Sequence, residues 1–507
     1  MLPPLATALF IAFFGTNVPF WDEWDLGPLL EKLARHQATL ADFFQPQQEH
    51  RFFLPKLILA PLALATHWNV IVELWLSFAV ALAGYAGLLL LVRRGGNGRL
   101  ILTSLAYFSL AAYENWLWGW QLSWFLADTL FIWAVVAAGS IKHRHLQIAS
   151  AALLCVLATF STAFGVASWI ALLPLLWLPA RDDERRASRA TAIVIWAALF
   201  AASLAVYLHQ FHPDLGGFPC ESFACWAGYL LTIIGSPLSR TSGVAIAAGV
   251  VMLSTFVFAA IRAWQMQDRQ AAQWTAIGLF AIGFTAINAI GRSGMGLDQA
   301  LSSRYLTPSS LLLIAVINLD THPIRFRRPV LIVVTTALIA QSLTVIPIGW
   351  HIKQGRDEAR VCVDLLLVND SPDCLPGIAR SGAILSGSAI AAHRAGLRPL
   401  VTESDFVRTA GAHGWIDSLS RLSATRHPGF IVRGRVDLPS RGVYAIAATL
   451  PESRRIVAAQ VIRGEAARWS LLLPPNLVQR SSAFELWLFD PAAGKLRPLP
   501  GRITVPH

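Results

Sequence analysis

Three carboxylates and two indoles stand together near the start of the chain, in the segment Trp21-Asp22-Glu23-Trp24-Asp25. Asp22 and Asp25 are three residues apart, so they share one face if the segment is helical. The segment directly follows an apolar stretch, and partial desolvation beside a bilayer makes a carboxylate a stronger base. We therefore expect Asp22 to act as a general base, with Asp25 in reserve and Glu23 orienting the base. The alternative is a solvated loop with interfacial tryptophans.

Further polar residues lie at the ends of later apolar stretches. Arginine suits phosphate because its planar fork donates to two oxygens, so Arg304 and Arg292 are candidate phosphate ligands. An arginine at a helix end can alternatively snorkel to the interface, and each other polar group could be a hydrogen bond between helices. The residues are Glu73, Glu114, Asn115, Gln121, Asn288, Arg292, Arg304 and Tyr305.

Glu49 and His50 complete the set of early polar candidates. Together with Glu23 they could orient a base or hold a divalent cation, if one is used. Zinc or manganese needs three or four converging ligands, which this short segment does not supply. The sequence therefore predicts no particular metal.

The composition determines which elements must position these residues. Of 507 residues, 55% are hydrophobic and 14% are charged, with a mean hydropathy of +0.52, which is too apolar for soluble domains. The net charge of +11 falls in short clusters between apolar runs, which argues against nucleic-acid binding. We expect a polytopic α-helical membrane protein with about eleven transmembrane helices. The apolar stretches are 2–18, 69–92, 100–113, 117–139, 146–160, 163–179, 190–208, 241–262, 272–290, 306–320 and 329–349.

Arginine and lysine cluster in every second connection between these stretches. The positive-inside rule makes those connections cytoplasmic. A transmembrane domain 1–350, with its first outer loop 19–56, then precedes an outward soluble domain 351–507. The polar residues at the span ends fall on this outer side, which predicts one shared cavity. The basic clusters are Arg93/Arg94/Arg99, Lys142/Arg144, Arg181/Arg185/Arg186/Arg189, Arg262/Arg269 and Arg325/Arg327/Arg328.

Two other features agree with this topology. Cys220/Cys225 and Cys362/Cys374 fall as close pairs in outward segments, which predicts two disulfides in an oxidising compartment; unpaired thiols are the alternative. Apolar residues recur every three to four positions over 26–44, which predicts an amphipathic helix on the membrane surface.

The chain uses arginine much more than lysine and shows no eukaryotic targeting signal, which favours a bacterial inner membrane.

The C-terminal domain carries more charge and more turn residues than the rest of the chain. A helix at 357–368 precedes short strands separated by Pro, Gly and Ser, and this pattern favours a small β-sandwich. The C-terminal domain would bind an acceptor glycan or cover the cavity predicted at the outer ends of the spans. The predicted strands are 429–436, 443–449, 455–462, 468–473 and 484–489.

The layout resembles the GT-C superfamily of integral membrane glycosyltransferases, including the protein O-mannosyltransferase and aminoarabinose transferase branches. The resemblance covers the architecture of residues 1–350, and only Asp22-Glu23 is motif-like. It implies sugar transfer from a polyprenyl-phosphate donor to a glycan, lipid or protein acceptor at the outer membrane face, among membrane lipids. Asp22 would deprotonate the acceptor hydroxyl. The residues expected to bind donor phosphate or sugar are Arg304, Arg292, His50, Glu49, Tyr305, Glu114 and Gln121.

Two other functions are compatible with a membrane protein. A transporter or flippase of lipid-linked saccharides would place charges near the midplane and show inverted repeats, whereas here the polar layer lies outward and no repeat is visible. A non-catalytic scaffold that presents the C-terminal domain would leave the acidic segment without a role.

Overall fold

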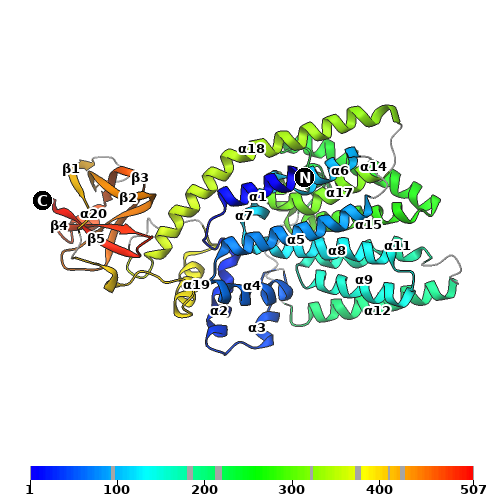
Figure 1. Cartoon of the computed structure of the whole chain (residues 1–507), viewed down its shortest axis with the longest axis horizontal. Coiled ribbons are helices and arrows are strands. Elements are labelled where there is room, and N and C mark those ends of the chain that lie inside the picture. Colours follow the sequence, from blue (N-terminus) through cyan, green and yellow to red (C-terminus); the bar gives the residue numbers. More distant parts are fainter. Residues whose placement is uncertain are drawn as a thin grey trace. The chain divides into compact units, whose positions relative to one another are not determined.

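The chain divides into two compact units, each of which is described by itself. The computed structural model describes residues 2–48, 50–92, 97–179, 186–211, 220–319, 324–370, 378–408, 411–422 and 429–505. Unit 1 comprises Met1–Gly15, Thr39–Leu62 and Val70–Trp350, and unit 2 comprises Thr16–Ala38, Ala63–Asn69 and His351–His507. Figure 1 labels their helices and strands.

Unit 1 is built from apolar helices. Within the described residues, six helices are long and apolar enough to cross a membrane, and five shorter apolar helices accompany them. The predicted count of about eleven spans is therefore not confirmed. The long helices are Val70–Leu91 (α5), Gly119–Ser140 (with α8), Ser188–Leu208 (in α12), Ser242–Met266 (α14), Arg269–Met295 (with α15) and Pro329–Asp364 (in α18).

Shorter helices complete the element order. The apolar ones are α1 (Leu2–Phe14), α4 (Phe53–Thr66), α9 (Arg144–Thr159), α13 (Phe223–Gly235) and the run Ala163–Trp177, which includes α10 (Ala167–Ala171) and α11 (Leu173–Trp177). The others are α2 (Gly27–Ala34), α3 (Leu40–Phe44), α6 (Asn97–Tyr107), α7 (Tyr113–Leu117), α16 (Leu297–Ala300), α17 (Leu306–Asn318), α19 (Gly382–Arg394) and α20 (Pro475–Val478). Helices α8, α12, α15 and α18 span Leu122–Ser140, Arg186–Leu208, Arg269–Arg292 and Ile324–Asp364.

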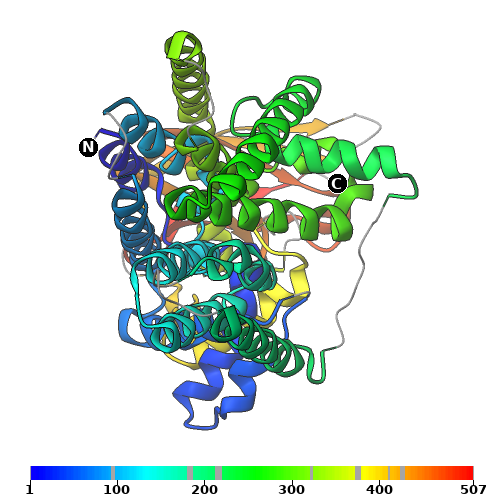
Figure 2. The same ribbon diagram turned by 90° about the vertical axis from the view of Figure 1, so that its right-hand side faces the viewer.

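Close packing holds the bundle of unit 1 together. Helices α5, α8, α9 and α12 run side by side (Figure 1), and Figure 2 shows the helices nearly end-on. Where α13 meets α14, a Cβ added to Gly235 would lie 1.8 Å from the Ala245 carbonyl oxygen, and one added to Gly249 would lie 2.1 Å from the Leu231 carbonyl oxygen. Small residues thus let the two backbones touch, as is usual between membrane helices.

Two arginines join three connections at one end of unit 1. Arg269 donates to the carbonyls of Ala138, Gly139 and Pro179 at 2.8, 2.9 and 2.7 Å. Arg144 donates to the carbonyls at 176 and 178, at 3.0 and 2.9 Å. The connections around 140, 179 and 268, all predicted to lie on one side of the membrane, therefore meet at the same end of the bundle.

The single amphipathic helix predicted over 26–44 is wrong. Helix α2 ends at Ala34, and His36 adopts a left-handed conformation with φ of 56°. Thr39 then starts α3 with a capping box, in which its backbone N–H and hydroxyl both donate to Asp42 at 2.8 Å. Helix α2 buries Leu29 and Leu30, whereas α3 has no buried residue, so the apolar period over 26–44 does not mark one buried face.

The C-terminal part of unit 2 is a five-stranded antiparallel sheet. Its strands are β1 (Gly414–Leu422), β2 (Gly429–Thr449), β3 (Ile456–Leu473), β4 (Ala483–Asp490) and β5 (Lys495–Thr504). The order is β1-β2-β4-β5, with β3 paired along β2. Strands β1 and β4 pair with the first and second halves of β2 respectively.

The predicted β-sandwich is not confirmed, since the described strands form one sheet. Two predicted strands merge into β2, because the segment between them forms an irregularity from Asp437 to Gly442 within the ladder. One face of the sheet carries its own core, which includes Val432, Ile446 and Leu488. The other face packs residues such as Trp487 and Phe489 on Leu365, which directly follows α18.

The early segment of unit 2 packs tightly on α19. A Cβ added to Gly27, at the start of α2, would lie 2.7 Å from the Ser388 Cβ and 2.8 Å from its Cα and carbonyl oxygen. Only glycine allows this approach, because two of the three opposing atoms belong to the backbone.

We predict that Gly27→Ala lowers the stability of the protein by about 1–3 kcal/mol, because an extra methyl must displace the α19 backbone. Thermal unfolding of the purified chain in detergent measures the loss. Gly387→Ala in α19 is the matched control, since an added Cβ meets nothing within 4 Å there and alanine favours a helix. A Gly27→Ala protein as stable as Gly387→Ala would contradict the packing.

A half-buried carboxylate ends α18. About 20 residues suffice to cross a bilayer, so the polar end of this helix, from His351 onward, extends beyond a span. Burial raises the pKa of Asp364 to about 6, against the opposing effect of Arg360 and Arg398. The folded chain thus holds a proton on Asp364 that the unfolded chain has already lost between about pH 4 and pH 6, and stability falls as the pH rises through that window.

We predict that Asp364→Asn stabilises the protein by up to about 3 kcal/mol above pH 6, and by little near pH 4, because it removes a charge that is costly when folded. Thermal unfolding midpoints at pH 4.5 and 7.5 test this. Asp437→Asn, which changes an exposed carboxyl of β2, should shift neither midpoint. An equal gain at both pH values would show that charge is not the cause.

Candidate functional site

The candidate base residues of unit 2 lie against one arginine. Residues Trp21–Leu26 form a 3₁₀ helix, in which side chains three residues apart eclipse each other. Asp22 and Asp25 therefore point the same way, and both reach Arg380. The Arg380 Nε lies 3.3 Å from Asp22 Oδ1, and Nη2 pairs with Asp25 Oδ2. The two carboxylates are 19% and 18% exposed, so water reaches both.

The acidic segment is anchored on both sides of these carboxylates. The Trp21 N–H donates to the Ile378 carbonyl at 2.6 Å, and the Arg356 guanidinium lies 4.2 Å from the centre of the Phe20 ring. Glu23 is fully buried, and its Oε2 accepts the Phe20 N–H at 3.1 Å. Glu23 thus shapes the helix that presents the other two acids.

Sequence reasoning missed Arg380, the residue that organises this pair. It lies 355 positions from Asp25, and no local pattern marks it. It directly precedes α19, whose N-cap Ser381 accepts the Ile384 N–H at 3.2 Å. The contact between α19 and α2 therefore fixes where Arg380 stands.

A second polar group, in unit 1, brings together predicted residues from connections far apart in sequence. One oxygen of Glu114, Oε2, accepts from the hydroxyls of Ser302 and Ser303 at 3.1 and 2.6 Å and from the Arg304 N–H at 3.1 Å. Asn115 donates to the Arg304 carbonyl at 2.9 Å. The two residues together fix the backbone that carries Arg304.

Tyr305 connects this polar group to Arg292 and to the helix that follows Gln121. Its hydroxyl accepts from Arg292 Nη1 at 3.1 Å, and its ring stacks on Trp124 with centres 6.0 Å apart. Gln121 precedes Trp124 by three residues, one turn earlier in the chain, and is buried. Arg304, Arg292, Tyr305, Glu114 and Gln121 therefore lie in one region of unit 1.

Several buried polar atoms of this region lack partners. Within the described part of the chain, no hydrogen bond reaches Asn115 Oδ1, Gln121 Oε1, Trp120 Nε1 or Arg304 Nε. Native proteins leave few buried polar groups unpaired, so such a group calls for a water or a ligand. The region is thus suited to a polar ligand with donors and acceptors.

His50 lies at a different junction of unit 1. Its Nδ1 accepts the Ala163 N–H at 3.2 Å, which puts the proton of a neutral ring on Nε2. Its ring packs on Phe52, which in turn packs on Trp120 next to Gln121. Glu49 lies outside the described residues. The described residues contain no group of three His, Cys, Asp or Glu side chains that could hold a metal ion.

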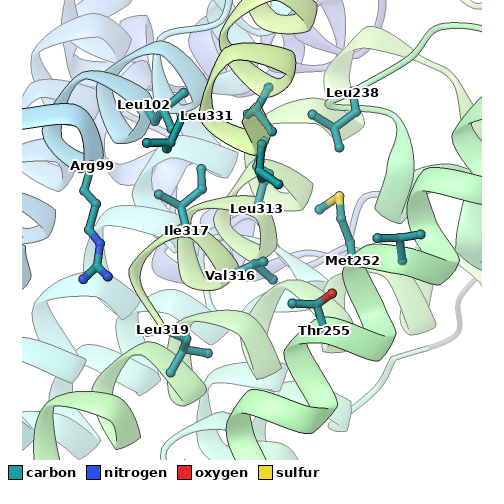
Figure 3. Close-up of a pocket in the computed structure, with 13 residues that line it drawn as sticks. Arg99, Leu102, Leu238, Met252, Thr255, Leu313, Val316, Ile317, Leu319 and Leu331 are labelled. Carbon is teal, nitrogen blue, oxygen red and sulfur yellow. The ribbon is translucent and has the colours of Figure 1, made fainter. Parts of the chain in front are cut away.

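An apolar cavity of about 210 Å³ lies elsewhere in unit 1, among α6, α14, α17 and α18. Figure 3 shows Arg99 at its edge, the only charged residue among the described residues that line it, and side chains such as Leu313, Ile317 and Met252 around it. Such a cavity can take part of a hydrocarbon chain.

The cysteine pairs are partly described. Cys220 and Cys225 form a disulfide, as predicted, and the buried Cys155 is a free thiol. Cys362 is also disulfide-bonded, while Cys374 lies outside the described residues.

Comparison of the chain with protein-family models, with curated proteins and with solved structures gives no match.

We predict that Glu114→Gln destabilises the protein by about 1–3 kcal/mol, because an amide replaces a charged acceptor that satisfies three donors. Ser302→Ala, which removes one of the three bonds, should cost less. Thermal unfolding of both variants in one detergent compares them. Equal losses would mean that the three donors do not depend on the charge of Glu114.

Proposed function

We propose that this protein is a membrane glycosyltransferase that moves a sugar from a polyprenyl-phosphate-linked donor to a glycan, lipid or protein acceptor of the cell envelope. The observation that carries the proposal is the pair Asp22 and Asp25, held together by Arg380 and accessible to water. This pair occurs in a chain with six helices apolar enough to cross a membrane. General acid–base catalysis needs a positioned side chain that can take up or release a proton, and a water-accessible carboxylate is such a group.

The carboxylates of unit 2 supply the base. Asp22 takes the proton of an acceptor hydroxyl, whose oxygen attacks the anomeric carbon of the donor sugar while the bond from that carbon to the phosphate oxygen breaks. Arg380 Nε, 3.3 Å from Asp22 Oδ1, holds that carboxylate in place. Asp25 and Arg380 act as positioning residues.

We propose Arg304 and Arg292 of unit 1 as ligands of the donor phosphate. Charge develops on the departing phosphate, and arginine stabilises it with paired hydrogen bonds. Glu114 and Asn115 fix the backbone at Arg304, while Arg292 bonds to Tyr305 nearby. The unpaired Arg304 Nε and Gln121 Oε1 offer a donor and an acceptor to a sugar phosphate.

We place this chemistry on the non-cytoplasmic face of a bacterial inner membrane. The arginine-bearing connections around 140, 179 and 268 meet at one end of unit 1, and the positive-inside rule assigns that end to the cytoplasm. The disulfide between Cys220 and Cys225 suits the oxidising side.

A flippase of lipid-linked saccharides is the second candidate, on one observation. Asp128 of α8 is fully buried, and neither carboxyl oxygen has a hydrogen-bond partner among the described residues. Ionisable groups inside a span commonly mark an ion or substrate path.

The test is transfer of radiolabelled sugar from membrane polyprenyl-phosphate donors to endogenous acceptors by the purified protein. We predict that Asp22→Asn lowers transfer by at least about 100-fold, the usual contribution of a general base, while donor binding is retained. Asp437→Asn, at an exposed position of β2, should transfer as well as the wild type.

Other outcomes separate the alternatives. Arg304→Gln should weaken donor binding, which Asp22→Asn leaves intact. Equal transfer by Asp22→Asn, Asp25→Asn and the wild type would rule out this base. If no form transfers sugar from any donor, and donor moves across proteoliposomes only when Asp128 is intact, the flippase replaces the transferase.

A further inference from the structure

A polar pocket of about 390 Å³ lies within unit 2, apart from Asp22 and Asp25. Its walls are the end of α18, the segment 397–401 and the turn between β4 and β5, with Asn17 and His67 at its edge. The volume falls in the range of about 300–1,000 Å³ that is usual for small-molecule sites.

Two cations of the pocket are held in fixed positions. Lys495 Nζ lies 2.6 Å from Asp405 Oδ1. The Arg398 guanidinium donates to the carbonyls of Asn17 and Trp68, at 2.6 and 3.0 Å. These contacts restrict the conformations of both side chains in the absence of a ligand, so the pocket is preorganised.

The turn between β4 and β5 is fixed as well. Asp490 Oδ1 accepts the N–H groups of Ala492 and Ala493 at 3.0 and 3.4 Å. Gly494 follows with φ of 62°, a conformation that favours glycine. Pro491 and Pro399 add apolar surface to the pocket wall.

Asp364 is incompletely compensated in the pocket, because Arg360 and Arg398 offset only part of the effect of its burial. The nearest basic atom, Arg360 Nε, is 3.9 Å from its Oδ2, and no described residue donates a hydrogen bond to the carboxyl group. Burial raises the pKa of Asp364 for this reason, and the residue therefore costs the fold stability at neutral pH. Such a cost is typical of residues that serve binding.

The hydrogen-bonding groups of the pocket indicate the chemistry of its ligand. Asp364 needs hydrogen-bond donors, Lys495 and Arg360 can donate to oxygens, and the prolines suit an apolar ring face. A saccharide offers several hydroxyl donors, oxygen acceptors and a C–H face in one small ring. The pocket carries both signs of charge, Asp364 and Asp405 beside Arg360, Arg398 and Lys495, so a ligand with both donors and acceptors fits it better than a purely anionic one.

We propose that this pocket binds a saccharide unit, with Asp364 accepting hydrogen bonds from its hydroxyl groups and with Lys495 and Arg360 donating to its oxygens. The choice of a saccharide as ligand rests on the proposed glycosyltransferase function, and the pocket would then hold the acceptor glycan. All residues that line the pocket belong to unit 2. Saccharide binding to the pocket can therefore be measured in the absence of the polyprenyl-phosphate donor.

The experiment titrates the full chain in nanodiscs against three fluorescent tetrasaccharides: neutral cello-oligomer, amino-bearing chitosan oligomer and anionic galacturonate oligomer. We expect the neutral or the amino series to bind, and Asp364→Asn to weaken that binding at least tenfold without loss of thermal stability. Lys495→Gln should also weaken it, and the control Asp437→Asn should not. Absence of binding in all three series, binding of the galacturonate series alone, or unchanged affinity in Asp364→Asn would overturn the proposal.

The sugar-transfer assay distinguishes this failure from failure of the proposed function. Saccharide binding that depends on Asp364 in a protein that transfers no sugar would leave the pocket intact and the transferase wrong. Wild-type transfer with an unchanged acceptor KM in Asp364→Asn would leave the transferase intact and the pocket wrong.

Discussion

A bilayer offers no hydrogen-bond partner to a peptide group, and this constraint governs most of the structure of unit 1. Helices satisfy their own backbone, so the apolar stretches become helices, and polar side chains are left mainly at helix ends. Those ends are where Glu114 can gather Ser302, Ser303 and the Arg304 N–H around a single oxygen. Apolar helices with polar ends thus account for the polar region of unit 1.

The sequence predicted the class of the fold well because hydropathy is a local property. Helices, the C-terminal strands and the Cys220/Cys225 disulfide follow from runs, turns and spacing. The number of spans does not follow, because α9 and α13 are shorter than a perpendicular crossing requires. Strands β1 and β5 were missed because charged, small polar and turn-forming residues interrupt their few apolar positions.

The candidate site was predicted only as far as near neighbours determine it. The three-residue spacing of Asp22 and Asp25 correctly implied a shared face. Arg380 was beyond reach, because its position depends on the packing of α19 against α2, between residues hundreds of positions apart. Gly27 shows the same limit, since nothing nearby in sequence reveals that Ser388 will press against it. Contacts of this kind come from tertiary packing, which single-sequence patterns do not encode.

One guanidinium serves two acids, and this sharing makes the aspartates thermodynamically dependent on each other. When either carboxylate is lost, Arg380 is free to pair with the other alone, and the orientation of that carboxylate changes. Effects of changes at Asp22 and Asp25 should therefore be non-additive, as is usual for residues in direct contact with a common partner. A double-mutant cycle would measure a coupling free energy that belongs to the pair and to neither residue alone. The residue tolerated at one position during evolution would therefore depend on the residue at the other.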